Sequence, residues 1–215
     1  MGLFSGESQG GGENKEFEAP SEGKHVARLV GLAFTGTIDD TYQGNQTLKR
    51  RLLATFEIVD ELRSDGKPFL LTKNYNVSAS KFGSGFYAAK TSGLFKDLKS
   101  WLKPILGEKE PSSLHWLENA LEEARPAGLM IEHTDKGKPK IVSIKPVASA
   151  PAHVSKPWTW KVGVGMEKPV DMPEWIIKSA QESFEVKGWP ESTASAPPPK
   201  PQESGNDLND EDVPF

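Results

Sequence analysis

The sequence predicts a mainly β protein with helical insertions, and three observations carry that prediction. Apolar and polar residues alternate along several short segments, as they do in strands that are buried on one face. In the middle of the chain the period changes to that of an amphipathic helix, and alternation then returns. Turn-forming residues stand between alternating segments, at Asp65-Gly66 and in the run 135–139.

Three strands are expected before the helical part. The first is apolar and β-rich over 25–34, and the polar stretch 36–47 follows it as a loop. The second and third strands alternate over 48–59 and 69–78. In the second strand, Leu52 and Phe56 share one face, whereas Arg51 and Thr55 share the other, so the basic start of this strand is expected at the surface.

Two helices and a hairpin are expected next. Ser92 can cap a helix whose leucines and Trp101 form one apolar stripe, and Gly107 can end it. A second helix begins near Ser113, and the segments 128–133 and 140–147 then form a hairpin. Three strands, a helical insertion and two strands are the element order of a five-stranded OB-fold barrel, which binds oligonucleotides on one face. A small α+β domain of another topology is the alternative.

Composition divides the chain into four parts. Residues 1–21 are expected to be a disordered N-terminal arm, 22–150 the OB-fold nucleic-acid-binding domain, and 191–215 a disordered acidic tail extended by its proline run. The Trp-rich extension, 151–190, contains a short helix, with a capping box at 171–174. Its helix is too apolar to stand alone, so it must pack on the barrel, on a second subunit or on a partner.

Charge is distributed unevenly although the net charge is only −4. Residues 20–150 contain 19 Lys and Arg against 15 Asp and Glu, whereas residues 191–215 contain one Lys against six acids. A basic middle with acidic ends is typical of a polyanion-binding domain that carries a separate acidic tail.

Several classes of protein are disfavoured. The sequence lacks a phosphate-binding loop, a dinucleotide fingerprint and metal-ligand spacing among its four histidines, so no enzyme, cofactor or metal site is expected. No cysteine is present, which agrees with a reducing cytoplasm. No signal peptide is expected in the Gly- and Ser-rich first residues, and no apolar run has the length to span a membrane.

Single-stranded nucleic acid suits the sequence better, because it needs cations for phosphates and aromatic faces for bases. Basic and aromatic residues are interleaved at the second strand, the third strand, the glycine-rich segment after it and the last hairpin. The candidate DNA-binding residues are Tyr42, Lys49, Arg50, Arg51, Lys73, Tyr75, Lys81, Phe82, Phe86, Tyr87, Lys136 and Lys138. In an OB-fold these elements line one groove, so the side chains are expected to converge.

The end of the printed chain is a second candidate site. Acidic residues precede a short apolar tip, which suits a basic-rimmed hydrophobic pocket on another protein. The candidate partner-binding residues are Asp210, Glu211, Asp212, Val213, Pro214 and Phe215.

This tip, the strand content and the helical segment 92–101 together resemble phage-encoded single-stranded-DNA-binding proteins with an OB-fold. The resemblance implies a non-catalytic protein that coats exposed strands during phage DNA replication, recombination and repair in the cytoplasm of the infected bacterium. It also implies that the tip recruits a polymerase, helicase, primase or nuclease, with self-association possible. The Trp-rich segment departs from the bacterial form, which puts a bacterial tetramer in doubt. The alternatives are an RNA-binding OB-fold protein, an adaptor without nucleic acid, and a nuclease that uses Asp39 and Asp40.

Overall fold

The computed structural model describes residues 18–39, 48–79, 86–163 and 167–188. The main antiparallel sheet has the strand order β4-β3-β2-β1-β5-β6, and β7 adds to β1 in parallel. In chain order the elements are β1 (Gly23–Asp39), β2 (Leu48–Leu62), β3 (Pro68–Ala79), β4 (Phe86–Tyr87), α1 (Gly93–Trp101), α2 (Lys103–Leu106), α3 (His115–Glu122), β5 (Pro126–His133), β6 (Pro139–Lys145), β7 (Trp158–Lys161), α4 (Glu174–Ala180) and α5 (Phe184–Lys187).

The prediction of a mainly β chain with helical insertions is confirmed, whereas a closed barrel is not shown. Each neighbouring pair along the six-strand path is antiparallel. Strands β3 and β6 also approach one another, but no hydrogen-bonded ladder joins them within the described part of the chain. Within these residues the sheet is open between β3 and β6.

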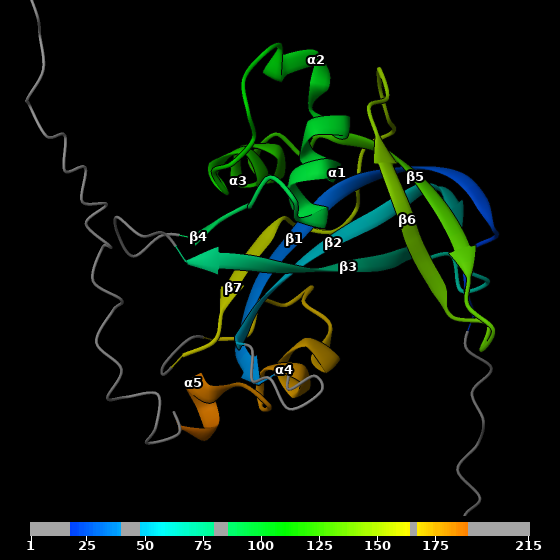
Figure 1. The fold of residues 1–215 in the computed structure, drawn as a ribbon. Helices are drawn as coiled ribbons and strands as arrows, with labels where there is room; N and C mark the ends of the chain where they lie inside the picture. The colour runs from blue at the N-terminus through cyan, green and yellow to red at the C-terminus, as the bar shows by residue number, and fades with distance from the viewer. Residues whose placement is uncertain (1–17, 40–47, 80–85, 164–166, 189–215) are drawn as a thin grey trace, which may run out of the picture.

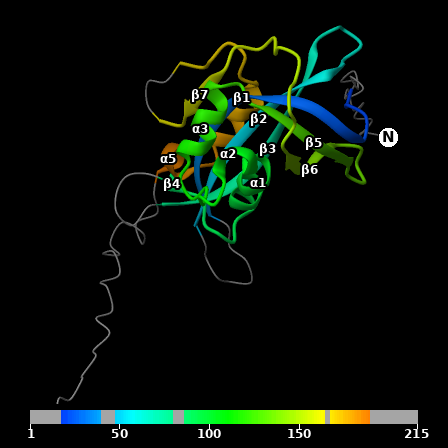
Figure 2. The same ribbon diagram turned by 90° about the horizontal axis from the view of Figure 1, so that it is seen from above.

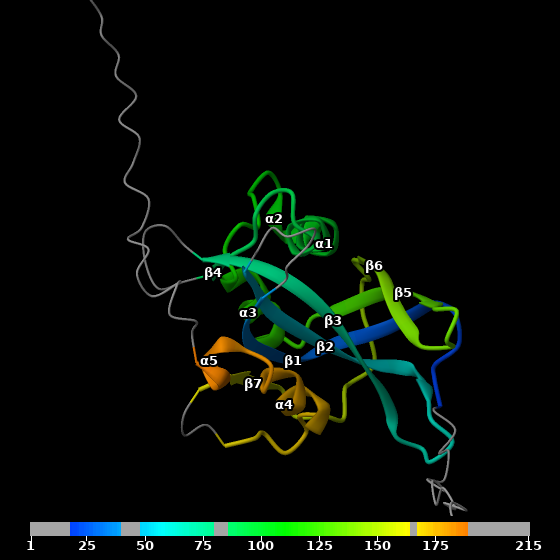
Figure 3. The same ribbon diagram turned by 60° about the horizontal axis from the view of Figure 1, so that its bottom comes forward.

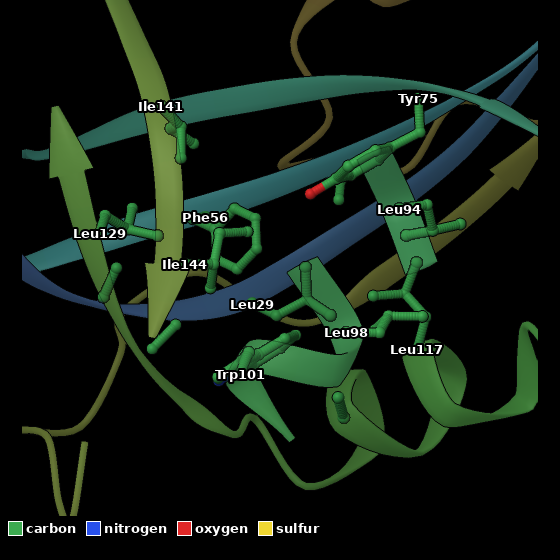
Figure 4. Close-up of a cluster of buried hydrophobic side chains, with 14 of the residues drawn as sticks. Leu29, Phe56, Tyr75, Leu94, Leu98, Trp101, Leu117, Leu129, Ile141 and Ile144 are labelled. Carbon is green, nitrogen blue, oxygen red and sulfur yellow. The ribbon is translucent and has the colours of Figure 1, made fainter. Parts of the chain in front are cut away.

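The helices α1–α3 lie on one face of the sheet and α4 and α5 on the opposite side, whereas β7 extends the sheet beside β1 (Figures 1 and 3). We call the first side the helix face and the second the outer face. The larger core cluster fills the helix face, where Phe56 of β2 meets the indole of Trp101 edge-on, with 5.8 Å between ring centroids. Figure 4 shows side chains of β1, β2, β3, β5 and β6 meeting those of α1 and α3.

Local signals explain most of the helix layer. The Ser92 hydroxyl accepts a hydrogen bond from the Phe95 amide at 3.1 Å, as predicted for the cap of α1. After α3, Ala124 has a positive φ of 42°, and the amides of Ala124 and Arg125 return to the carbonyls of Leu121 and Ala120. These two bonds form a Schellman ending, in which alanine occupies a position that usually favours glycine.

Strand β1 is longer than the sequence predicts. It continues through Gly36 to Asp39, where a loop was expected, because these residues pair with the start of β2, up to Asp39 opposite Leu48. Two glycines of β1, Gly31 and Gly36, are contact points for distant residues. A Cβ at Gly31 would lie 2.2 Å from the Trp158 indole, and one at Gly36 would lie 2.4 Å from Ser183. The bare backbone at these positions therefore lets the Trp-rich extension approach β1.

The Trp-rich extension packs on its own sheet, which settles one of the three possibilities left open by the sequence. Trp158 and Ile176 form a second core cluster with Ala33 of β1 and Leu53 of β2. The buried Glu57 carboxylate accepts hydrogen bonds from the amides of Val154 (2.6 Å) and Ser155 (2.8 Å).

Polar contacts of β1 also attach the Trp-rich extension to the sheet. The Arg28 guanidinium donates to the carbonyls of Ala124, Ala150 and Pro151 at 2.5–2.6 Å. At the other end of β1, the Glu185 carboxylate accepts from the amide and hydroxyl of Thr37 at 2.6 and 2.8 Å. The bond from Arg28 to Pro151 is exposed and those from Thr37 to Glu185 are part-buried, and together they attach the extension to two points of β1.

The predicted capping box at the start of α4 is wrong. Pro173 occupies the N-cap position, and α4 has no side-chain cap hydrogen bond. Asp171, the residue expected to cap, instead accepts a hydrogen bond from the Lys156 amide at 2.9 Å. The carboxylate therefore ties two parts of the extension together.

Candidate nucleic-acid interface

The basic start of β2 lies at the end of the sheet where β1 finishes. Cross-strand pairs place Arg50 beside Thr37 and Val77, and Arg51 beside Gly36 and Asn76. Directly opposite residues share a face of the sheet, and successive residues alternate between faces. Because Val77 belongs to the core cluster under the helices, Arg50 lies on the helix face and Arg51 on the outer face. The pairing with β1 does not decide the face, because β1 is irregular between Phe34 and Gly36 and the Thr37 hydroxyl donates to Glu185 of α5 on the outer side.

The outer face gathers polar side chains around Arg51. Asn76 pairs with Arg51, and Asn74 pairs with Leu53 two residues further along the same face. Ser78 follows on that face of β3, and Tyr87 of β4 pairs with it. We call Arg51, Asn74, Asn76 and Tyr87 the outer-face cluster. The two asparagines are exposed, whereas Arg51 and Tyr87 are half-buried.

The guanidinium groups of Arg50 and Arg51 are free of carboxylate partners among the residues that the structure describes. Other cations of the sheet differ: Arg63 pairs with Asp65 at 3.4 Å, and Arg28 is occupied by three carbonyls. An arginine whose guanidinium donates no hydrogen bonds within the protein keeps its planar set of N–H groups for a ligand. Phosphate and carboxylate oxygens match that geometry. Lys49 is half-buried on the outer face, in register with Ile38.

Tyr75 and Lys73 depart from the expectation that they face a nucleic acid. Tyr75 is only 5% exposed, and its hydroxyl donates to Asp97 of α1 at 2.9 Å. Lys73 pairs with the same carboxylate at 2.8 Å and is 19% exposed. Both side chains lie on the helix face, because α1 covers the face of β3 that they share. The ring offers no open surface for stacking, and the ammonium charge is already neutralised.

Lys136 and Lys138 are exposed in the turn between β5 and β6, but they do not join Arg51. Gly23, at the start of β1, pairs with Ile131 beside this turn, whereas Asp39, at the end of β1, pairs with Leu48. The two basic groups therefore lie at opposite ends of a 17-residue strand. Figure 2 shows the same separation, with β4 at one end of the molecule and the β5–β6 hairpin at the other. The predicted convergence on one surface is wrong for these two lysines.

The remaining candidates lie outside the residues that can be placed. Tyr42, Lys81 and Phe82 fall outside the described residues, as do Asp210, Glu211, Asp212, Val213, Pro214 and Phe215. The backbone of Phe86 is described in β4, paired with Ala79, but its side chain is not.

Sequence reasoning did not single out Asn74 and Asn76 as site residues. The signal was present, because alternation along β3 puts both on the face opposite the buried Tyr75. What was missing was the identity of the buried face, which the packing of α1 decides.

The described residues hold neither a metal-ligand group nor a membrane-spanning helix. In the described ranges, no three or more His, Cys, Asp or Glu side chains are grouped so that they could hold a metal ion. None of the helices in the same ranges has the length and apolar character needed to cross a membrane.

Comparison of the chain with models of protein families, with curated proteins and with solved structures finds no match. The interface is therefore interpreted from its own geometry.

Proposed function

We propose that the chain binds single-stranded DNA without sequence preference, with the outer-face cluster at the centre of its interface. The observation that carries this proposal is the unpaired Arg51 guanidinium, which lies beside the exposed Asn76 and on the same face as Tyr87. Arginine binds a phosphate through paired donors, asparagine supplies donors and acceptors, and a tyrosine ring can stack on any base. Binding through these groups reads the backbone and the flat face of a base rather than its sequence.

We also propose that β1, β2, β3, β5 and β6 form an OB-type barrel. Support comes from the pairing order β3-β2-β1-β5-β6, in which three consecutive strands are followed by a helical insertion and a hairpin that returns to β1. The approach of β3 to β6 also supports a barrel, since the Lys73 ammonium lies 3.4 Å from the Val142 carbonyl. In a barrel of this kind the second and third strands line the binding face. The outer-face cluster belongs to those strands and to β4 beside them.

In this proposal the protein acts without catalysis in phage DNA replication or recombination. Tyr42, Lys81, Phe82 and Phe86 contribute further contacts, and the acidic tip 210–215 recruits a partner enzyme. The support for these parts is the sequence alone, in the interleaving of cations and aromatics and the acidic tip.

The test is a titration of intrinsic fluorescence with oligo-dT, with matched RNA and with a duplex, at several salt concentrations. We expect saturable quenching by oligo-dT that weakens with salt, because bound phosphates release counterions. The variant Arg50→Gln/Arg51→Gln removes the arginine of the cluster and its chain neighbour on the helix face. It should reduce the slope of log affinity against log salt by about 1.4, at about 0.7 for each lost phosphate contact.

Lys136→Gln/Lys138→Gln is the matched comparison, because it removes the same charge from the opposite end of β1. Equal losses in the two variants would contradict a site at the outer-face cluster. Preference for RNA would favour an RNA-binding protein. No response to any oligonucleotide would overturn the proposal and favour an adaptor that binds protein.

A further inference from the structure

The exposed side of α1 carries a stripe of lysines that the outer-face cluster does not use. Lys96 and Lys99 of α1 are exposed, and so is Lys103, the first residue of α2. The spacing of three residues puts Lys96 and Lys99 on one side of α1. Lys103 follows directly after Leu102, the residue that ends α1. We call Lys96, Lys99, Lys103 and the neighbouring Lys145 the lysine face.

No carboxylate balances this stripe within the described residues. Asp97 is the only acid in α1, and it turns towards the sheet, where it binds Lys73 at 2.8 Å and accepts from the Tyr75 hydroxyl at 2.9 Å. Surface helices commonly place Glu three or four residues from Lys, and such pairs stabilise the helix, whereas like charges at these spacings repel. The stripe therefore lowers the stability of the free helix slightly, and a bound polyanion would reverse that effect.

Strand β6 extends the positive surface. Lys145, at its end, is exposed and donates to the Ser100 hydroxyl of α1 at 3.1 Å, so its ammonium is held beside the stripe. Lys140, at the other end of β6, is also exposed. Neither lysine has a carboxylate partner among the placed residues.

Arg50 connects this surface with the interface already described. It lies on the helix face beside Val77, and Tyr75, two residues along β3, contacts α1 through Asp97. Arg51, its neighbour in the chain, lies on the outer face. A single DNA strand that contacts both Arg50 and Arg51 would therefore pass around the end of the sheet, from the outer face to the side that α1 covers.

We propose that the lysine face is a second phosphate-binding track for the same single strand, so that the preferred ligand is a strand long enough to reach from the outer-face cluster to α1. This inference rests on the proposed function. A short oligomer fills the outer-face cluster alone, and its affinity is independent of the lysine face. A long oligomer contacts both surfaces and gains the additional counterion release.

The experiment compares oligo-dT of about 8 and about 40 nucleotides, lengths chosen around the roughly 4–16 nucleotides that one OB-fold covers. The variant is Lys96→Gln/Lys99→Gln/Lys103→Gln, since glutamine and lysine have similar helix propensity. For the long oligomer we expect a salt slope smaller by about 2 and an affinity roughly 10- to 100-fold lower at low salt, from three lost phosphate contacts. For the short oligomer we expect no change.

The matched control is Lys24→Gln/Lys156→Gln/Lys178→Gln, which removes three exposed lysines that lie on β1, in the extension and on α4. Thermal unfolding of both variants checks that the fold is intact. An equal loss of affinity for the long oligomer in the control variant would show that only net charge matters, and would overturn the inference. An equal loss of affinity for the short and long oligomers in the lysine-face variant would also overturn it. An unchanged long-oligomer slope would overturn the inference while leaving the proposed function standing. Failure of the unmodified protein to bind either oligomer would overturn both.

Discussion

At the residue scale, one buried carboxylate determines the roles of two predicted site residues. Asp97, 16% exposed, holds the Lys73 ammonium and the Tyr75 hydroxyl on the helix face. Burial, and then the negative charge of Asp97 and its hydrogen bond, raise the pKa of Tyr75 well above its ordinary value. The neutral phenol therefore belongs to the folded state, and the ring acts as part of the core.

This arrangement predicts the behaviour of Asp97→Asn. Lys73 would keep its charge but lose its counterion in a largely buried site, so we expect the variant to lose about 1–3 kcal/mol of unfolding free energy at neutral pH. Urea denaturation measures that loss. Lys90, whose ammonium pairs with Glu110 in a largely exposed position, offers the control, because Glu110→Gln should cost less than about 1 kcal/mol.

The raised pKa of Tyr75 sets an alkaline limit on the stability of the folded protein. Because the pKa of Tyr75 is raised in the folded protein, its contribution is complete below the unfolded value near 10 and is lost as pH rises through the folded value. In Asp97→Asn the pKa of Tyr75 should fall, since burial still raises it but the negative neighbour is gone. Titration of tyrosinate absorbance checks this. A Tyr75 pKa that does not change in the variant would show that Asp97 has no part in the shift.

At the element scale, the elements predicted correctly from the sequence are those specified by local interactions, and those that depend on distant residues were missed. Strands β2 and β3, helix α1 and the β5–β6 hairpin were predicted because their alternation, cap and turn residues lie within each segment. Strand β7 was not among the predicted strands, because its partner β1 is more than 120 residues away and the pairing is parallel. The length of β1 was missed for a similar reason, since the role of Gly36 depends on distant residues of α5 and the turn before it.

The contact between β1 and β7 yields a direct test. In Gly31→Ala the new Cβ would lie 2.2 Å from two indole carbons of Trp158, so the ring, now 6% exposed, would have to leave its site. We expect a loss of about 3 kcal/mol, combining overpacking with the lost burial of the indole. Urea denaturation and a red shift of tryptophan emission would report it. Gly93→Ala is the matched control, because a Cβ there meets nothing within 4 Å, and equal losses in the two variants would refute the contact as the cause.

At the scale of the whole molecule, the boundary that composition predicts between the domain and the Trp-rich extension does not separate two independent packing units. The extension was expected to be separate from the domain in composition, yet it shares two internal contacts with the sheet: the buried Glu57 carboxylate and a second core cluster. Composition describes what a segment is made of, whereas attachment depends on which surface it can bury. Alternation along β2 and β3 thus predicted which residues share a face, but not which face is covered, because the helix layer and the extension decide that.

These shared contacts predict that residues 18–188 unfold as one cooperative unit. Removing the extension would expose Ala33 and Leu53 of the sheet together with Trp158, and it would leave the Glu57 carboxylate without its two amide donors. Buried groups of this kind are costly to expose or to leave unpaired, so partial unfolding of the extension should be disfavoured at temperatures where the sheet is still folded. Thermal unfolding followed by tryptophan emission and by far-ultraviolet circular dichroism should therefore give coincident transitions. An earlier transition in tryptophan emission alone would mean that the extension detaches first, and that the outer face of β1 and β2 can be uncovered without unfolding the sheet.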